Sequence, residues 1–236
     1  IVIWIVVFLS LVRCISAESA KFFIKKGDQY RANLAYGEAI IYYERALEIE
    51  PNNMIAHRRI AETFMLTREY EKAKKHWEAV TLLKPTDADA FSSLGMCENS
   101  LGNFKAARGY FEKALIIDPE NVMAHKGMAT IFTEEESYEQ AEIWLRKSIQ
   151  LSQKRLSEDR EGILMVLLVC AYEELCFILE SQERFDEALK EYEEAQRFLP
   201  VNPPQQWRNE MAKLLMLKGQ YKEAIKHLET VTMKGY

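Results

Sequence analysis

The sequence predicts an all-α fold built from repeated pairs of helices. Of the 236 residues only 9 are Gly and 6 are Pro, which leaves room for long uninterrupted helices. Hydrophobic residues make up 48% and charged residues 28%, the balance of a folded chain. A short motif, an aromatic residue followed three positions later by alanine, also recurs with a period of 34 residues. A period of this length indicates stacked repeats rather than one globular core.

The recurring alanines set the register of the repeats. Ala39, Ala73, Ala107 and Ala141 are spaced by 34, and Ala188 and Ala224 follow at intervals of 47 and 36. An aromatic residue stands three positions before each alanine: Tyr36, Tyr70, Phe104, Tyr138, Phe185 and Tyr221. Six coincident pairs predict six repeats of one helix–turn–helix unit.

This pattern resembles the tetratricopeptide repeat family, whose 34-residue unit forms two antiparallel helices. With the recurring alanine at position 20, position 8 is always small: Gly27, Ala61, Gly95, Ala129, Cys176 and Ala212. Position 24 is always large: Tyr43, Trp77, Phe111, Leu145, Tyr192 and Leu228. Position 32 is proline in four units, Pro51, Pro85, Pro119 and Pro200, and Gln153 in another. The resemblance implies a right-handed α-solenoid in which the first helix of each unit lines a concave groove.

The register divides the chain into four parts. Residues 1–19 form an apolar N-terminal segment, expected to be a helix, and residues 20–155 hold repeats one to four. Residues 156–168 are an insertion that extends the flanking helices, and residues 169–236 hold repeats five and six. Two interpretations of the insertion remain open. Either two lengthened helices pack on each other, or its apolar residues form a docking patch for a partner: Ile163, Leu164, Val166 and Leu167.

The N-terminal segment predicts attachment to a membrane. As a helix, residues 1–12 would span roughly 18 Å, against about 30 Å for a hydrocarbon core. Arg13, Lys21, Lys25 and Lys26 follow, which favours repeats on the cytoplasmic-type side. The cysteines are scattered singly, which fits a reducing compartment. A signal anchor is the favoured interpretation; a helix packed on protein and an uncleaved signal peptide are the alternatives.

Candidate binding residues follow from the resemblance, because in this family positions 2, 5, 6, 9, 12 and 13 face the groove. The basic candidates lie in the first two units: Lys21, Lys25, Arg31, Arg58 and Arg59. Asn99 follows in the third unit, and the acidic candidates come later: Glu134, Glu173, Glu174 and Glu180. We expect a polarised groove that binds an extended peptide of opposite charge order. The alternative is a solvated helix face with no ligand.

Family members that capture the acidic tails of heat-shock chaperones use a clamp of Lys and Asn, then Asn, then Lys and Arg, over three units. The matching positions here hold Ile24 and Asp28, then Arg59, then Asp89 and Ser93. None of the clamp residues is present, so a chaperone-binding co-chaperone is disfavoured.

Several other functions are not indicated. The net charge of −5 offers no basic face for nucleic acid. The sequence has no Gly-rich phosphate loop, catalytic motif or cluster of metal ligands, so we expect no enzyme, no cofactor and no metal site. The predicted function is a non-enzymatic scaffold that binds other proteins or extended peptides and helps organise a larger, membrane-associated complex. The alternative is a permanent structural subunit of such a complex.

Overall fold

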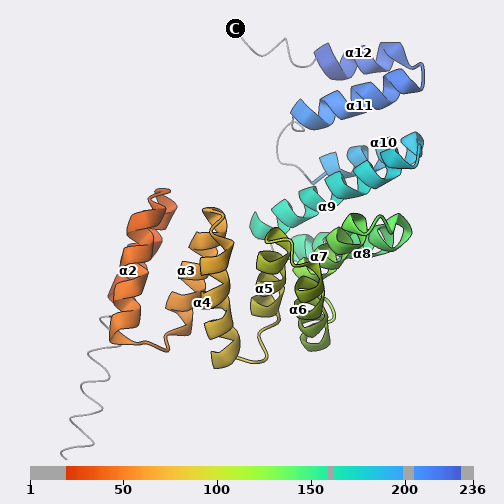
Figure 1. Ribbon diagram of the computed structural model, residues 1–236. Helices are drawn as coiled ribbons and strands as arrows, with labels where there is room; N and C mark the ends of the chain where they lie inside the picture. The colour runs from red at the N-terminus through yellow and green to blue at the C-terminus, as the bar shows by residue number, and fades with distance from the viewer. Residues whose placement is uncertain (1–19, 159–161, 199–204, 230–236) are drawn as a thin grey trace, which may run out of the picture. The chain divides into compact units, whose positions relative to one another are not determined.

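A computed structural model describes residues 20–158, 162–198 and 205–229 (Figure 1). These residues fold into helices joined by short turns, with no strand among them. A helix over residues 20–32 precedes the eleven that Figure 1 labels: α2 (Tyr36–Ile49), α3 (Met54–Leu66), α4 (Tyr70–Leu83), α5 (Ala88–Ser100), α6 (Phe104–Ile117), α7 (Val122–Glu134), α8 (Tyr138–Glu158), α9 (Gly162–Ser181), α10 (Phe185–Gln196), α11 (Gln205–Leu217) and α12 (Tyr221–Glu229). The predicted all-α fold is confirmed. The predicted N-terminal apolar helix, residues 1–19, lies outside the described residues.

The helices alternate as the repeat register requires. We call residues 20–32, α3, α5, α7, α9 and α11 the first helices, and α2, α4, α6, α8, α10 and α12 the second helices. Every second helix begins at the recurring aromatic residue, position 17 of its repeat.

The turn inside each repeat uses one left-handed residue. Position 15 has a positive φ in all six repeats: Leu34 (61°), Arg68 (61°), Gly102 (80°), Glu136 (55°), Glu183 (59°) and Gly219 (75°). Only glycine adopts this conformation without a steric penalty, so four repeats hold a side chain in a strained position.

Proline ends the second helices of the first three repeats. The residues just before it, Glu50, Lys84 and Asp118, are extended, with φ of −128°, −138° and −130°. Proline disfavours helical geometry in the residue that precedes it. In the fourth repeat Gln153 stands at this position, and α8 runs on to Glu158. The helices on either side of the predicted insertion, α8 and α9, are 21 and 20 residues long.

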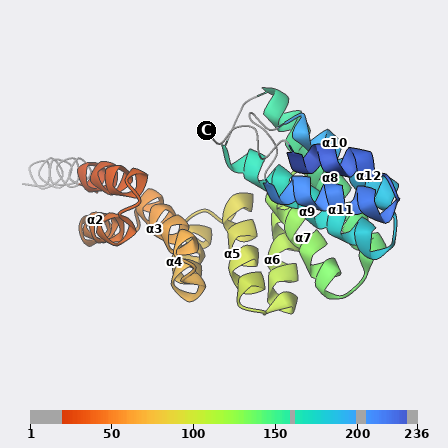
Figure 2. The same cartoon turned by 90° about the horizontal axis from the view of Figure 1, so that it is seen from above.

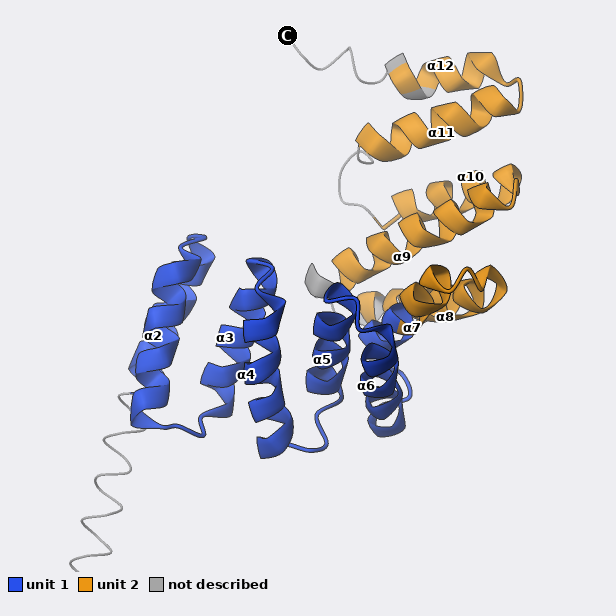
Figure 3. Cartoon of the chain, viewed as in Figure 1, with its two compact units in different colours: residues 1–127 blue, residues 128–236 orange. Residues whose placement is uncertain are grey.

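The chain forms two compact units that meet inside α7, between Gly127 and Met128 (Figure 3). In unit 1, α2, α3, α4, α5 and α6 stand side by side in sequence order (Figures 1 and 2). In unit 2, α9 packs on α8 and α10, and α11 packs on α12. Because each helix contacts mainly its neighbours along the chain, both units are stacks of repeats.

Glycines at the helix contacts allow large rings to fill the core of unit 1. A Cβ atom at Gly27 would lie 2.4 Å from Cε1 of Tyr43. One at Gly95 would lie 2.5 Å from Cε1 of Phe111, and one at Gly127 only 2.2 Å from Cζ of the same ring. Tyr43 and Phe111 are fully buried. The small residue at position 8 is therefore a steric requirement of the ring at position 24.

The core of unit 2 is built around α9. Tyr172, Leu175 and Leu179 on that helix are buried, and Trp207 of α11 is 1% exposed. The ring of Trp207 meets Tyr192 of α10 edge-on, with centroids 5.7 Å apart. Three helices from the fifth and sixth repeats thus share one apolar cluster.

Candidate interaction surface

Three first helices, α3, α5 and α7, are capped at their N-termini by the last residue of the preceding repeat. Oδ1 of Asn53 accepts a hydrogen bond from the Ala56 backbone N–H (3.0 Å), which caps α3. Asp87 caps α5 through Ala90 (3.1 Å), and Asn121 caps α7 in the same way. This cap satisfies one backbone donor that the helix leaves unpaired. We define the first-helix face as the side chains at positions 2, 5, 6, 9, 12 and 13 of the first helices.

On unit 1 this face carries a ladder of ion pairs between the first two repeats. Nη1 of Arg31 lies 2.7 Å from Oε2 of Glu62, which also contacts Nη1 of Arg59 at 3.0 Å. Nε of Arg59 lies 3.2 Å from Oδ1 of Asp28, which accepts a hydrogen bond from the Tyr43 hydroxyl (2.8 Å). Arg31 and Arg59, two of the five predicted cations, are thus neutralised by acids of the same face. These ion pairs were not predicted from the sequence.

Arg58, a third predicted cation, is part of the scaffold. Its Nη2 lies 2.6 Å from Oδ2 of Asp87, the buried cap of α5. Its guanidinium also lies over the Trp77 ring, 5.4 Å from the centroid. By contacting both Asp87 and the Trp77 ring, Arg58 stabilises the packing of the third repeat on the second.

The remaining candidates of unit 1 differ in their surroundings. Lys21 and Lys25 are exposed on the first helix. Asn99 is half-buried, and its Oδ1 atom is covered without a hydrogen-bond partner among the described residues. Of the basic set, Lys21 and Lys25 are the side chains open to solvent.

On unit 2 three of the four predicted acids lie together on α9, and each contacts a neighbouring helix. Oε1 of Glu173 accepts a hydrogen bond from the Trp207 indole (2.7 Å). Glu174 accepts from the hydroxyls of Thr130 (3.2 Å) and Thr133 (3.0 Å). Glu180 lies 3.6 Å from Nζ of Lys213. Burial raises the pKa of Glu180 above its usual value. The fourth acid, Glu134, is exposed at the end of α7.

The predicted apolar patch is narrower than the sequence suggested. Leu164 is 7% exposed and Leu167 is half-buried, whereas Val166 is 60% exposed. The side chain of Ile163 lies outside the described residues. Leu164 points into the unit because α9 turns one side of its apolar run toward the core. Leu164 is thus a buried member of the predicted patch, and Val166 is the solvent-facing member.

One buried ion pair was not predicted from the sequence. Position 11 is apolar in five repeats, Tyr30, Phe64, Phe132, Leu179 and Leu215, but it is Glu98 in the third. Glu98 is 4% exposed, lies 2.7 Å from Nζ of Lys74 and accepts a hydrogen bond from Asn103 (2.8 Å). Burial acts to raise the pKa of Glu98, but Lys74 and Asn103 outweigh it and hold the pKa below its usual value. A shallow depression of about 780 Å³ lies over this pair. A comparison of equivalent positions across the repeats would have identified Glu98 as the one acid at position 11.

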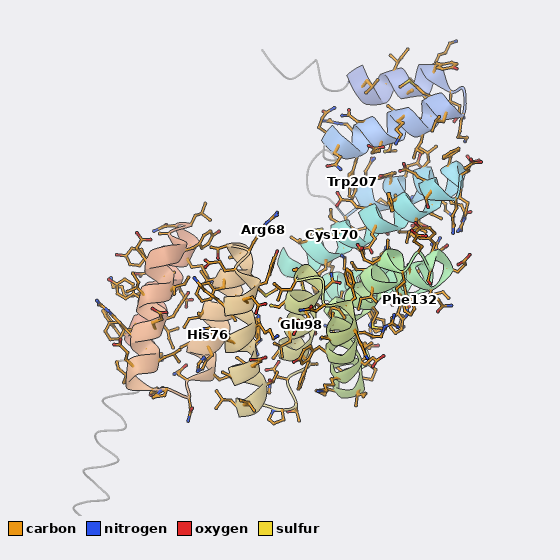
Figure 4. The ribbon with its side chains drawn as sticks, viewed as in Figure 1. Arg68, His76, Glu98, Phe132, Cys170 and Trp207 are labelled. Carbon is orange, nitrogen blue, oxygen red and sulfur yellow. The ribbon has the colours of Figure 1, made fainter. Side chains whose placement is uncertain are left out.

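Two histidines also meet across unit 1. Nδ1 of His57 on α3 lies 3.0 Å from Nδ1 of His76 on α4. Figure 4 labels His76. Nε2 of His57 lies 3.0 Å from the Pro51 carbonyl, which only accepts, so this nitrogen carries a proton. Neutral His57 then accepts at Nδ1 from His76. Burial above all, with a further contribution from the charge of Lys75, lowers the pKa of His76 to about 4. Across the described ranges no three His, Cys, Asp or Glu side chains gather as a metal site would require.

Comparison with known proteins identifies the family. Two tetratricopeptide repeat models match residues 20–53, and residues 58–122 and 100–155, together more than half of the chain. The chain belongs to the tetratricopeptide repeat family. The resemblance read from the register is confirmed, and this fold is typical of non-enzymatic protein-interaction scaffolds.

Several known proteins share part or all of this architecture. The chain is 31% identical over 107 residues to DnaJ homolog subfamily C member 7 of Mus musculus, an alignment that covers 45% of this chain and 22% of that protein. It is 26% identical over 171 residues to RNA polymerase II-associated protein 3 of Xenopus laevis, covering 62% and 26%. The matches thus span about a quarter of these relatives' lengths.

Two solved structures show the same fold over nearly the whole chain. PilF of Pseudomonas aeruginosa superposes with a TM-score of 0.70 at 16% identity, covering 93% of this chain and 95% of that one. PilW, described as a type IV pilus biogenesis factor, superposes at 0.71 with 18% identity, covering 91% and 93%. At these identities the likeness concerns the fold.

Proposed function

We propose that this chain is a protein-interaction scaffold that holds extended segments of partner proteins along its first-helix face. The observation that carries the proposal is the ion-pair ladder of Arg31, Arg59, Asp28 and Glu62, which fixes polar groups on that face before any partner arrives. Preorganised groups lose little conformational entropy on binding. Exposed Lys21 and Lys25 border the ladder and offer positive charge to a partner.

The proposal extends to a larger complex at a membrane, with the repeats on the cytoplasmic-type side. Its support is the apolar sequence of residues 1–12 followed by Arg13, Lys21, Lys25 and Lys26. Within the part of the chain that the structure describes, no helix combines the length and apolarity that crossing a bilayer requires. Residues 1–12 stand outside that part.

Co-purification of partners with the full chain from native membranes tests the scaffold. Lys25→Glu reverses an exposed charge of the first-helix face, and Lys75→Glu makes the same change on second helix α4. We expect the first substitution to reduce partner recovery and the second to leave it unchanged. Equal recovery with both variants would contradict binding at the first-helix face.

Membrane association is tested separately by flotation of the full chain and of a chain lacking residues 1–19. We expect the full chain to float with membranes and the shortened chain to stay behind. Flotation of both chains to the same extent would show that the N-terminal segment is not the attachment.

A co-chaperone role is a second candidate that the named relatives suggest, since one is a heat-shock cognate co-chaperone of Aspergillus fumigatus, 30% identical over 90 residues. The geometry does not favour it. Asp28, at a clamp position, is an acid held by Arg59 and Tyr43, and Ile24 at another is 9% exposed. Neither side chain is a donor for a peptide carboxylate.

A further inference from the structure

An exposed aromatic ring stands among the acids of α9. Phe177, at position 9 of the fifth repeat, is 58% exposed. Residues three and four apart are neighbours on a helix surface, so Glu173 and Glu174 lie one turn before Phe177 and Glu180 one turn after it. An aromatic ring of this size is normally buried or in contact with a partner.

The carboxylates around Phe177 are held in place by neighbouring helices. Trp207 of α11, which Figure 4 labels, is 1% exposed. Its indole donates to Oε1 of Glu173 at 2.7 Å. Thr133 of α7 donates to Glu174 at 3.0 Å. The uncharged indole of Trp207 fixes the direction of Glu173 without cancelling its charge. A partner would therefore meet carboxylates whose positions are already set.

The surface around the ring is acidic. Glu180 and Glu210 share the ammonium of Lys213, which lies 3.0 Å from Glu210 and 3.6 Å from Glu180. Glu173 accepts its hydrogen bond from the uncharged indole of Trp207. Burial raises the pKa of Glu180, so the site disfavours this negative charge when no further cation is present. An incoming positive group would relieve that penalty.

An apolar residue lies farther along the same side of the helix. Val166 is eleven residues, about three turns, before Phe177 and is 60% exposed. Half-buried Cys170 lies between them on that side. An occupant of this surface needs a cationic group at Phe177 and apolar side chains toward Val166.

We infer that this surface of α9, which we call the Phe177 face and define by Val166, Glu173, Phe177 and Glu180, docks a basic segment of a partner protein. An arginine guanidinium stacks on the Phe177 ring and hydrogen-bonds to Glu173, and an apolar neighbour in the segment covers Val166. Arginine fits better than lysine because its planar group stacks on a ring and binds a carboxylate through two nitrogens. This inference rests on the proposed function, since it names the chemistry of one partner segment on the first-helix face.

Fluorescence anisotropy with the full chain tests the Phe177 face at about 0.15 M ionic strength. The probes are a short labelled peptide that alternates arginine with leucine and a matched peptide that alternates glutamate with leucine. We expect the basic peptide to bind and the acidic one not to. Phe177→Ala and Glu173→Gln should each weaken binding by about three- to tenfold, the range for a lost cation–ring or charge contact. Glutamine retains an acceptor for Trp207, so the fold of this variant is preserved.

Matched controls separate specific docking from general attraction to an acidic chain. Ile143→Ala on α8 and Glu193→Gln on α10 remove an exposed apolar group and an exposed charge from second helices, and binding should stay within about twofold. Lys213→Met should tighten binding because it removes the cation beside Glu180, a gain that misfolding does not produce. Equal weakening by variants and controls, or equal binding of both peptides, would overturn the inference.

Other outcomes separate this inference from the proposed function. Sedimentation that shows self-association through Phe177 would assign the face to a second copy and overturn the inference. Partner recovery that depends on Lys25, with peptide binding indifferent to Phe177, would remove the inference and leave the proposed function. Peptide binding that requires Phe177, with partner recovery indifferent to Lys25, would support the inference and remove the part of the proposed function that rests on Lys21, Lys25 and the ion-pair ladder.

Discussion

Replacing Gly127 by alanine tests the packing of unit 1. The added Cβ would lie 2.2 Å from Cζ of Phe111, whereas ordinary contact begins near 3.4 Å, so the ring would have to move by about 1.2 Å. Phe111 is fully buried, and on another side it meets Gly95, where a Cβ would lie 2.5 Å from Cε1. The ring is therefore held between two glycines and has little room to retreat.

The expected loss follows from two opposing effects. Overpacking a core costs about 1–3 kcal/mol, and a 2.2 Å contact on a ring held between two glycines belongs to the upper part of that range, about 2–3 kcal/mol. Alanine in place of glycine inside a helix gains about 1 kcal/mol. Gly127→Ala should thus lower the free energy of unfolding by about 1–2 kcal/mol. The control is Gly109→Ala in α6, where nothing lies within 4 Å of the new Cβ and only the gain of about 1 kcal/mol remains.

Thermal unfolding followed by circular dichroism measures the difference. For a chain of this size about 1 kcal/mol corresponds to 2–4 °C, so Gly127→Ala should lower Tm by about 2–8 °C and Gly109→Ala should raise it by about 2–4 °C. If the two variants were equally stable, the claim that small residues are required at these helix contacts would be refuted.

Three further predictions concern pH, charge and backbone strain. Because the pKa of His76 is about 4 in the folded chain and about 6.5 when unfolded, stability is full above pH 6.5 and falls as the unfolded chain takes up a proton. From pH 7 to pH 5 the loss is smaller than the roughly 2 kcal/mol that the whole shift would give, because water screens the partly exposed ring, and urea unfolding of His76→Phe at both values should show a smaller loss still. Lys74→Ala leaves buried Glu98 without its cation and should destabilise the chain by about 2 kcal/mol in urea, whereas Lys74→Leu with Glu98→Phe should be close to wild type. Arg68→Gly relieves a φ of 61° and should raise the unfolding free energy by about 1 kcal/mol; a loss instead would show that the turn is not strained.

The scaffold was predictable because its determinants are local or periodic. Proline at position 32 and the recurring aromatic residue at position 17 mark helix ends within a few residues of the sequence. In the fourth repeat Gln153 stands in place of this proline, and α8 runs on to Glu158. The left-handed residue at position 15 was not predicted, because four different residue types, Leu, Arg, Glu and Gly, occupy it.

The candidate surface was less predictable because it depends on contacts between repeats. Arg59 and Asp28 are 31 residues apart, and only the stacking of two helices brings them within 3.2 Å. The sequence identified Arg59 as a groove residue and left its pairing open. His57 and His76 meet for the same reason, through antiparallel packing of α3 on α4. The sequence of one helix shows its charged side chains but not which of them form ion pairs with a neighbouring helix.

Leu164 and Val166 show the same limit for apolar residues. Both belong to one apolar run, yet one is 7% and the other 60% exposed. A helix that is apolar on several sides gives no periodic signal of which side faces the core. The exposure of Phe177 could not be predicted for the same reason, because the sequence of α9 is apolar along most of its length.

Residue-specific photo-cross-linking in native membranes tests most directly whether partners bind the first-helix face. A photoreactive phenylalanine analogue would replace Lys25, Met96 or Phe177 on first helices, and Leu82, Ile116 or Ile143 on second helices, where the side chains are 82%, 81% and 60% exposed. We predict cross-links to partner proteins from the first set and none above background from the second. Cross-links from the second set alone would contradict the account.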